Sequence, residues 1–195
     1  RRLRGRSIAA VSAIDAMTHP WIEQSVGHVD GKIDQHKSGR DHQDDALNGK
    51  VVVLIDCVHQ HLADAGNRQR ILDEMAGHGI PSSRIELQDW SITVDWSANM
   101  AYYDRLDIAL DPVAAVGGGT TTCDALWMGV PVITLAGDRM ASRMSSSMLD
   151  AIGHPEWIAR SEQEYLEKVV ALARSPEQGR RIRLSLRSEM AQSPL

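Results

Sequence analysis

The chain of 195 residues contains no phenylalanine, two cysteines and no long uninterrupted run of apolar residues. Cys57 and Cys123 are too few and too far apart for a disulfide framework or a CxxC metal site, so we expect a reducing compartment, the cytoplasm. A membrane-spanning helix needs about 20 mostly apolar residues, so no membrane span is predicted. The formal net charge of -5 argues against nucleic-acid binding, which requires a basic surface.

The rest of the composition, 43% hydrophobic and 24% charged, is typical of a soluble globular protein of about one domain. We divide the chain into a poorly defined N-terminal segment, residues 1–45, and a domain over residues 46–195. Charged residues and glycines fill residues 22–45 with almost no apolar periodicity, which predicts a loop. The short apolar run over 8–14 is not a convincing signal peptide. Because the chain does not begin with Met, we expect it to be part of a longer protein.

From residue 50 onward, short apolar runs alternate with helical patterns. The runs predict strands over residues 51–55, 84–88, 106–110 and 131–135. Helical spacing, stops at glycine and a capping-box pattern at Ser161 and Glu164 predict helices over 67–77, 98–103, 120–128, 142–152, 162–173 and 176–190. Strands that alternate with helices favour a parallel sheet in a doubly wound, Rossmann-like α/β domain.

A glycine-rich loop, residues 117–119, joins the predicted strand ending before Asp111 to the predicted helix 120–128. Glycines allow the backbone to approach a phosphate closely, and the amides of Thr120, Thr121 and Thr122 are expected to be unpaired donors at the helix N-terminus. The three hydroxyls add further donors, and Asp124 is placed to bind a ribose hydroxyl. The alternative is a tight turn followed by a simple N-cap. No lysine follows the glycines, so the loop is not a Walker motif.

Several other polar and aromatic residues have plain structural interpretations. We interpret His59 and His61 as surface residues, because no third metal ligand lies nearby. Cys123 has no histidine partner in the sequence and is predicted to pack. Arg139 and Arg143 are placed either to reach a diphosphate or to form surface ion pairs. Two groups complete the set: arginines predicted on the solvated face of the last helix (Arg180, Arg181, Arg183 and Arg187), and tryptophans predicted to pack in the core or at its rim (Trp90, Trp96, Trp127 and Trp157).

Three segments together resemble a known family: residues 107–112 (DIALDP), 118–139 (GGTTTCDALWMGVPVITLAGDR) and 141–143 (ASR). They are similar to the C-terminal domain of the O-linked N-acetylglucosamine transferases, the family 41 glycosyltransferases, and above all to the bacterial members. The motifs at 152–153, 157–159, 164–165 and 193–195 agree. The resemblance is strong from about residue 103 to 195, moderate over 51–90 and marginal before that.

The resemblance implies the C-terminal, donor-binding half of a glycosyltransferase built from two Rossmann-like domains, the GT-B architecture. The implied reaction transfers N-acetylglucosamine from UDP-N-acetylglucosamine to a Ser or Thr hydroxyl of a protein. In some bacterial relatives the donor is UDP-glucose and the acceptor an Asn amide, and both options stay open. The implied partners are the nucleotide-sugar donor, a protein acceptor and a missing N-terminal catalytic half or repeat region. No metal and no cofactor are implied.

Site residues follow from motif position. Thr120 and Thr121 correspond to the residues that hold the diphosphate, and Asp124 to the residue that holds the ribose; the donor-binding set also includes Gly118, Gly119, Thr122 and Asn99. Asn99 stands where the family has a histidine that helps to hold the uridine. Lys32 lies at about the spacing of the family's phosphate-contacting lysine, although a solvated charge is the other interpretation. The family pattern LDPFPYNGGTTT is here one residue longer, LDPVAAVGGGTTT.

Two further functions compete with the transferase. A truncated, non-catalytic UDP-binding relic or partner module is favoured by Asn99, by the longer loop and by the featureless first 45 residues. Another nucleotide-sugar enzyme with two Rossmann-like domains, such as an epimerase, is disfavoured by the run TTTCDALWMG at residues 120–129.

Overall fold

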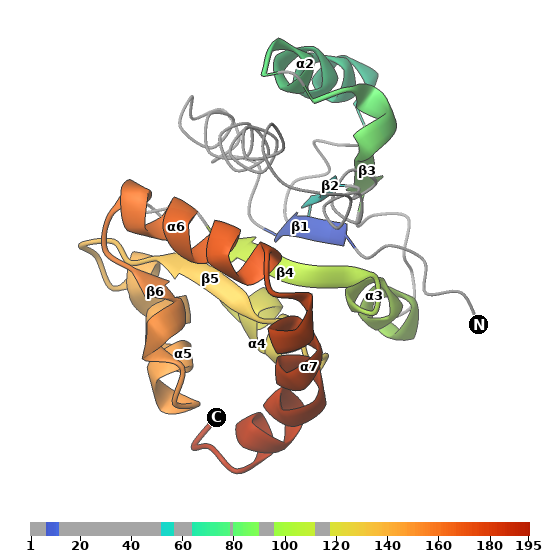
Figure 1. Cartoon of the computed structure of the whole chain (residues 1–195). Coiled ribbons are helices and arrows are strands. Elements are labelled where there is room, and N and C mark those ends of the chain that lie inside the picture. The colour runs from blue at the N-terminus through green and yellow to red at the C-terminus, as the bar shows by residue number, and fades with distance from the viewer. Residues whose placement is uncertain (1–6, 12–51, 57–63, 79, 90–95, 112–117) are drawn as a thin grey trace, which may run out of the picture.

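The computed structural model describes residues 7–11, 52–56, 64–78, 80–89, 96–111 and 118–195. Its strands form one sheet in which all neighbours are parallel, in the order β3-β2-β1-β4-β5-β6 (Figure 1). The strands are β1 (Ser7–Val11), β2 (Val52–Asp56), β3 (Ile85–Asp89), β4 (Leu106–Asp111), β5 (Val132–Leu135) and β6 (Ile158–Ala159). The α-helices are α2 (Ala65–Gly77), α3 (Trp96–Tyr103), α4 (Thr120–Trp127), α5 (Met144–Ala151), α6 (Glu162–Ala173) and α7 (Pro176–Ala191). Short 3₁₀ turns are η5 (Ser82–Arg84), η7 (Ala141–Arg143) and η8 (Pro155–Trp157).

This strand order confirms the predicted doubly wound α/β fold. The order reverses between β1 and β4, because the chain proceeds to one edge through β2 and β3 and to the other through β5 and β6. In open sheets of this kind, ligands bind in the crevice outside the carboxyl ends of the strands at that reversal. The end of β4, where Asp111 lies, borders this crevice.

Strand β1 is the main element that the sequence analysis missed. It pairs with β2 on one side and with β4 on the other, so residues of the segment 1–45 supply a central strand. The run is only five residues long, contains two alanines and shows no alternation of polar and apolar residues. Its pairing depends on neighbours distant in sequence, which a local pattern does not reveal. The division at residue 45 stays a prediction.

The other predicted strands and helices are confirmed, with ends shifted by a few residues. The predicted helix over 142–152 is a 3₁₀ turn, η7, followed by α5, and the two-residue strand β6 was not predicted. At the start of α6, the Ser161 hydroxyl accepts from the Glu164 amide at 3.2 Å, as the capping box predicts. The Glu164 carboxylate accepts from the Arg160 amide at 2.8 Å and not from Ser161.

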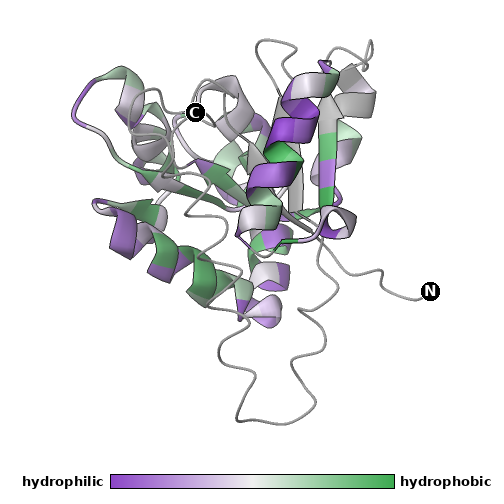
Figure 2. Cartoon of the chain, turned by 90° about the horizontal axis from the view of Figure 1, so that it is seen from above, coloured by the Kyte–Doolittle hydropathy of each residue, from purple (hydrophilic) through white to green (hydrophobic). Residues whose placement is uncertain are grey.

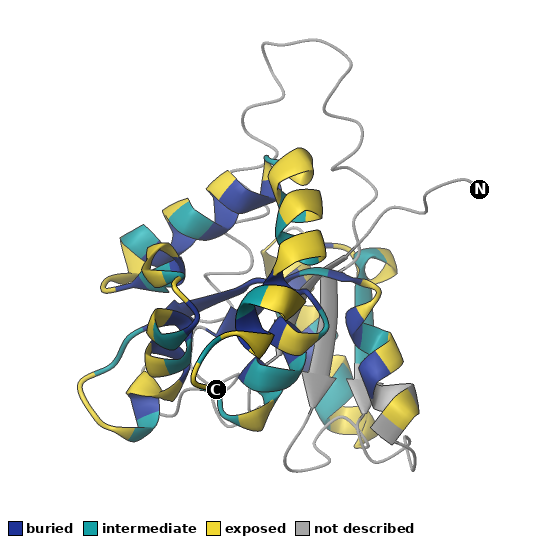
Figure 3. Cartoon of the chain, turned by 90° about the horizontal axis from the view of Figure 1, so that it is seen from below, coloured by how far each residue is buried: buried dark blue, intermediate teal, exposed yellow. Residues whose placement is uncertain are grey.

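Helices cover both faces of the sheet. Helix α6 packs on β4 and β5 from one face, whereas α4 and α5 pack from the other (Figure 1). Hydrophobic residues concentrate on β4, on β5 and on the inward sides of the helices around them (Figure 2), and the same surfaces are buried (Figure 3). The buried residues of α6 recur at helical spacing: Tyr165, Leu166, Val169, Val170, Leu172 and Ala173.

Helix α7 corrects one prediction about the arginines. Arg183 does not lie on a solvated face: its guanidinium donates to the carbonyl oxygens of Tyr103 and Met128 at 3.3 Å each, and also to that of Leu106. Arg187 lies over the Trp127 ring, 4.6 Å from its centroid. Helix α7 is therefore tied to the ends of α3 and α4 and to the start of β4.

Two packing predictions can also be checked in the described residues. Trp157 is buried, 4% exposed, and Trp127 lies at the rim, 37% exposed, as predicted. Cys123 packs with its sulfur 3.7 Å from that of Met148, and burial raises the pKa of its thiol. His59, His61 and Trp90, and the side chain of Trp96, lie outside the described residues.

Candidate functional site

The glycine-threonine segment lies at the N-terminus of α4, after the carboxyl end of β4. Gly119 occupies the N-cap position and no side chain caps the helix. Asp64 caps α2 and Ser161 caps α6 through side-chain oxygens, whereas α5 and α7, like α4, have no side-chain cap. An uncapped helix N-terminus presents backbone N–H groups at the positive end of the helix dipole.

The three threonines have different environments. Thr120 is exposed and Thr121 is half-buried, and no hydrogen bond within the described residues engages either amide. The Thr122 amide, expected to be an unpaired donor, instead donates to the Gly119 carbonyl at 3.0 Å. Its hydroxyl is buried against the Ser145 hydroxyl, 2.9 Å away. The predicted set of three open amides is thereby reduced to Thr120 and Thr121, and a direct ligand contact by Thr122 stays a prediction.

Asp124 lies one helical turn beyond Thr120, and α-helical spacing puts the two on the same face. It is half-buried, and burial raises the pKa of its carboxyl. No hydrogen bond or ion pair within the described part of the chain engages the carboxylate. An unengaged acceptor at this position fits the predicted contact with a ribose hydroxyl, which stays a prediction.

The residues that hold the loop were not predicted as functional. The Gly118 amide donates to Asp111 Oδ2 at 3.2 Å, and the Ser145 hydroxyl donates to the Gly118 carbonyl at 3.2 Å. Asp111 could have been found in the sequence as a carboxylate that directly follows an apolar strand. Ser145 gives no such signal, because it lies on a different helix, 27 residues after Gly118.

Four further residues are candidates for donor binding in the sequence: Lys32, Asn99, Arg139 and Arg143. Lys32 and the side chain of Asn99 lie outside the described residues; the Asn99 backbone belongs to α3. Arg139 forms an exposed ion pair with Asp138 at 4.0 Å. A role of Arg139 toward a diphosphate stays a prediction, as does that of Arg143.

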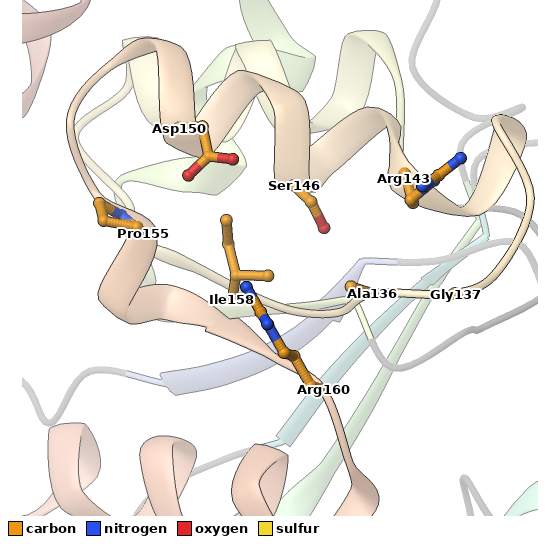
Figure 4. Close-up of a pocket in the computed structure, with 8 residues that line it drawn as sticks. All are labelled: Ala136, Gly137, Arg143, Ser146, Asp150, Pro155, Ile158 and Arg160. Atoms are coloured by element: carbon orange, nitrogen blue, oxygen red, sulfur yellow. The ribbon is translucent and has the colours of Figure 1, made fainter.

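Arg143 borders a separate cavity of about 390 Å³ beside α5, shown in Figure 4. The Ser146 hydroxyl and the Asp150 carboxylate face Ile158 and Arg160 across this space (Figure 4). Ala136, Gly137 and Pro155 complete the lining. The cavity and the glycine loop both lie near carboxyl ends of strands. Helix α5 borders both of them, because Ser145 contacts the loop and Ser146 lines the cavity.

Two kinds of feature are absent from the described residues. None of the described helices is both long and apolar enough to cross a membrane. In the same residues, no group of three or more His, Cys, Asp or Glu side chains is placed to hold a metal ion.

Together, the reversal between β1 and β4 and the glycine loop at the start of α4 define a doubly wound domain of the class that binds nucleotides. Residues 69–195 match the family described as Glycosyl transferase family 41, so the chain belongs to this family. The fold is the C-terminal, Rossmann-like half of a GT-B glycosyltransferase, as the resemblance implied.

The similar proteins are named as N-acetylglucosamine transferases. The chain is 36% identical over 128 residues to the probable UDP-N-acetylglucosamine–peptide N-acetylglucosaminyltransferase SPINDLY of Petunia hybrida, covering 66% of this chain and 13% of the relative. SPINDLY of Arabidopsis thaliana is also 36% identical, covering 66% and 14%. An O-GlcNAc transferase mutant (K341M) of Thermobaculum terrenum has a similar structure, with TM-score 0.76 and 27% identity, over 98% of this chain and 33% of that one. The chain therefore spans only a small part of its relatives.

Proposed function

We propose that this chain is the donor-binding part of a UDP-sugar-dependent protein glycosyltransferase, with UDP-N-acetylglucosamine as donor and a protein Ser or Thr hydroxyl as acceptor. The observation that carries the proposal is the uncapped N-terminus of α4, with Asp124 one turn along, in a chain of family 41. The names of the SPINDLY relatives and of the Thermobaculum protein support the donor and the acceptor class.

In this proposal the amides and hydroxyls of Thr120 and Thr121 bind the diphosphate, and Asp124 accepts a hydrogen bond from the ribose. The acceptor hydroxyl displaces UDP from the anomeric carbon directly. Backbone donors and the helix dipole stabilise the negative charge that develops on the leaving UDP, so the proposed mechanism requires no metal. The acceptor-side base and the protein acceptor site belong to a catalytic half outside this chain.

The second candidate is a non-catalytic UDP-binding module. It is favoured by the loop sequence LDPVAAVGGGTTT, which is one residue longer than the family pattern. It is also favoured by Asn99, which can hydrogen-bond but cannot carry a histidine's charge. Both candidates predict UDP binding, but only the transferase predicts transfer of labelled N-acetylglucosamine to protein once the catalytic half is supplied. We further propose a cytoplasmic location, supported by the low cysteine content.

The binding prediction is tested by calorimetric titration of the whole chain with UDP. We expect saturable micromolar binding, equivalent to about -8 kcal/mol. The double variant Thr121→Ala, Asp124→Ala should weaken binding at least about tenfold, because hydrogen bonds to charged groups contribute roughly 1.5–3 kcal/mol each. Glu167→Ala, an exposed change on α6, serves as the control and should leave the affinity unaltered. Equal affinities of the double variant and the unaltered chain contradict the site assignment.

A further inference from the structure

Gly118, the residue before the N-cap of α4, is held on both sides of its α-carbon. Its amide donates to Asp111 Oδ2 at 3.2 Å, from the end of β4. Its carbonyl accepts from the Ser145 hydroxyl at 3.2 Å, from α5. Two hydrogen bonds from different elements thus fix the peptide groups that lead directly into the amides of Thr120 and Thr121.

The space around Gly118 is equally constrained. A Cβ added at this residue would lie 2.3 Å from Thr122 Oγ1 and 3.1 Å from Ser145 Oγ. These two hydroxyls are 2.9 Å apart, and both side chains are buried, 3% exposed for Thr122 and 0% for Ser145. A buried hydrogen-bond network of this kind holds one conformation, because any other leaves a polar group unpaired.

Asp111 connects this network to the sheet. Its side chain is 2% exposed, and Oδ2 also accepts from the Thr134 hydroxyl of β5 at 2.8 Å. Burial raises the pKa of the carboxyl, and the nearby Ser145 hydroxyl and the hydrogen bonds from Thr134 and the Gly118 amide act in the opposite direction. Oδ1 is buried without a hydrogen-bond partner among the described residues. The carboxyl group of Asp111 thus accepts from β5 and from the glycine loop through one oxygen, which joins the loop directly to the sheet.

We propose that Asp111 and Ser145 are positioning residues for the nucleotide-sugar donor: they clamp Gly118 and so hold the amides of Thr120 and Thr121 in the orientation that binds the diphosphate. Donors fixed before the ligand arrives need no reorganisation on binding, which raises affinity. This inference rests on the proposed function. It assigns roles to two residues that do not touch the ligand themselves.

The test compares UDP with uridine, which lacks the diphosphate. Dissociation constants are measured on the whole chain by calorimetry for UDP and by displacement of UDP for uridine. Asp111→Ala and Ser145→Ala should each weaken UDP binding about tenfold and change uridine binding less than about twofold, because each removes one of the two hydrogen bonds that hold Gly118. Asp111→Asn should recover most of the loss of Asp111→Ala, because its amide oxygen still accepts from Gly118.

A stability control separates positioning from general damage. Leu186→Ala removes a fully buried side chain of α7 and should lower the melting temperature, while the folded protein keeps its affinity for UDP. If Asp111→Ala does not fold, Ser145→Ala alone decides the outcome. If neither substitution changes the affinity for UDP, or if the affinities for UDP and uridine fall equally, this inference is overturned and the proposed function is not. Absence of UDP binding by the unaltered chain overturns the proposed function and this inference together.

Discussion

The two ends of helix α4 are built differently. At the C-terminal end, Gly129 adopts a φ of 76°, its amide donates to the Leu126 carbonyl at 3.0 Å, and the Val130 amide donates to the Ala125 carbonyl at 2.8 Å. The Met128 carbonyl receives a further hydrogen bond from Arg183. At the N-terminal end, Gly119 provides no side-chain cap. One end satisfies its own backbone groups, whereas at the other no described residue accepts a hydrogen bond from the Thr120 or Thr121 amide.

The two ends of this eight-residue helix therefore serve different tasks, folding at one end and donor binding at the other. The closed end secures α4 against α7 and contributes to folding, because carbonyls at a helix C-terminus need partners. The open end keeps backbone N–H donors for an anion. Its backbone is held in place by the hydrogen bonds of Asp111 and Ser145 to Gly118, whereas in α6 a capping side chain holds the first turn. Stability and donor binding should therefore respond to different substitutions.

The largest effect is expected at the closed end, from Gly129→Ala. The residue is left-handed, and a Cβ would lie 2.8 Å from the Arg183 carbonyl oxygen. Gly153→Ala is the matched control, because Gly153 has a φ of 84° but no atom within 4 Å of its Cβ position. The control should cost about 1–2 kcal/mol for the left-handed backbone, and Gly129→Ala should cost clearly more.

Urea denaturation measures both variants, and calorimetry measures their UDP affinity. We expect the folded Gly129→Ala protein to bind UDP as tightly as the unaltered chain. Equal stability losses at the two glycines would show that the contact with Arg183 is not a tight one. A loss of UDP affinity with Gly129→Ala would remove the distinction between the two ends.

A smaller effect on stability is expected from pH, because His154 is hydrogen-bonded to Glu189 of α7. Burial lowers the pKa of His154, but hydrogen bonds to Glu156 at 2.7 Å and Glu189 at 2.8 Å outweigh it, so its pKa is raised above 6.5. A raised folded-state pKa gives stability that is fully present below the unfolded pKa and is lost as pH rises through the folded one. For partly exposed ion pairs we expect less than about 1 kcal/mol.

Urea denaturation between pH 5.5 and 8.5, a range of about 3 units around the ordinary histidine pKa, tests this contribution. His154→Phe is the appropriate variant, because an aromatic ring can keep the stacking on Trp157, whose ring centroid lies 3.9 Å from that of His154. The variant should lose the part of the pH dependence that falls above pH 6.5. An unchanged stability profile would exclude His154 as its source.

The sequence predicted what is encoded locally. The capping-box pattern of Ser161 and Glu164 marked the start of α6, and the glycines before Thr120 marked the start of α4 as the candidate site. The hydrogen bond from Ser145 to Gly118 and those of Arg183 were not predictable, because they join elements that are brought together only by folding. Strand β1 was missed for the same reason. Thr122 shows the limit of motif reasoning: adjacent identical residues point in different directions on a helix.

The amide spectrum of the ¹⁵N-labelled chain, recorded by NMR during a titration with UDP, tests the central claim most directly. The account predicts that the largest shifts occur at Gly119, Thr120 and Thr121, while Gly129 and Val130 at the other end of α4 change little. Shifts centred on Ser146 and Arg160, beside the cavity of Figure 4, or no shifts at the α4 N-terminus at saturating UDP, would contradict it.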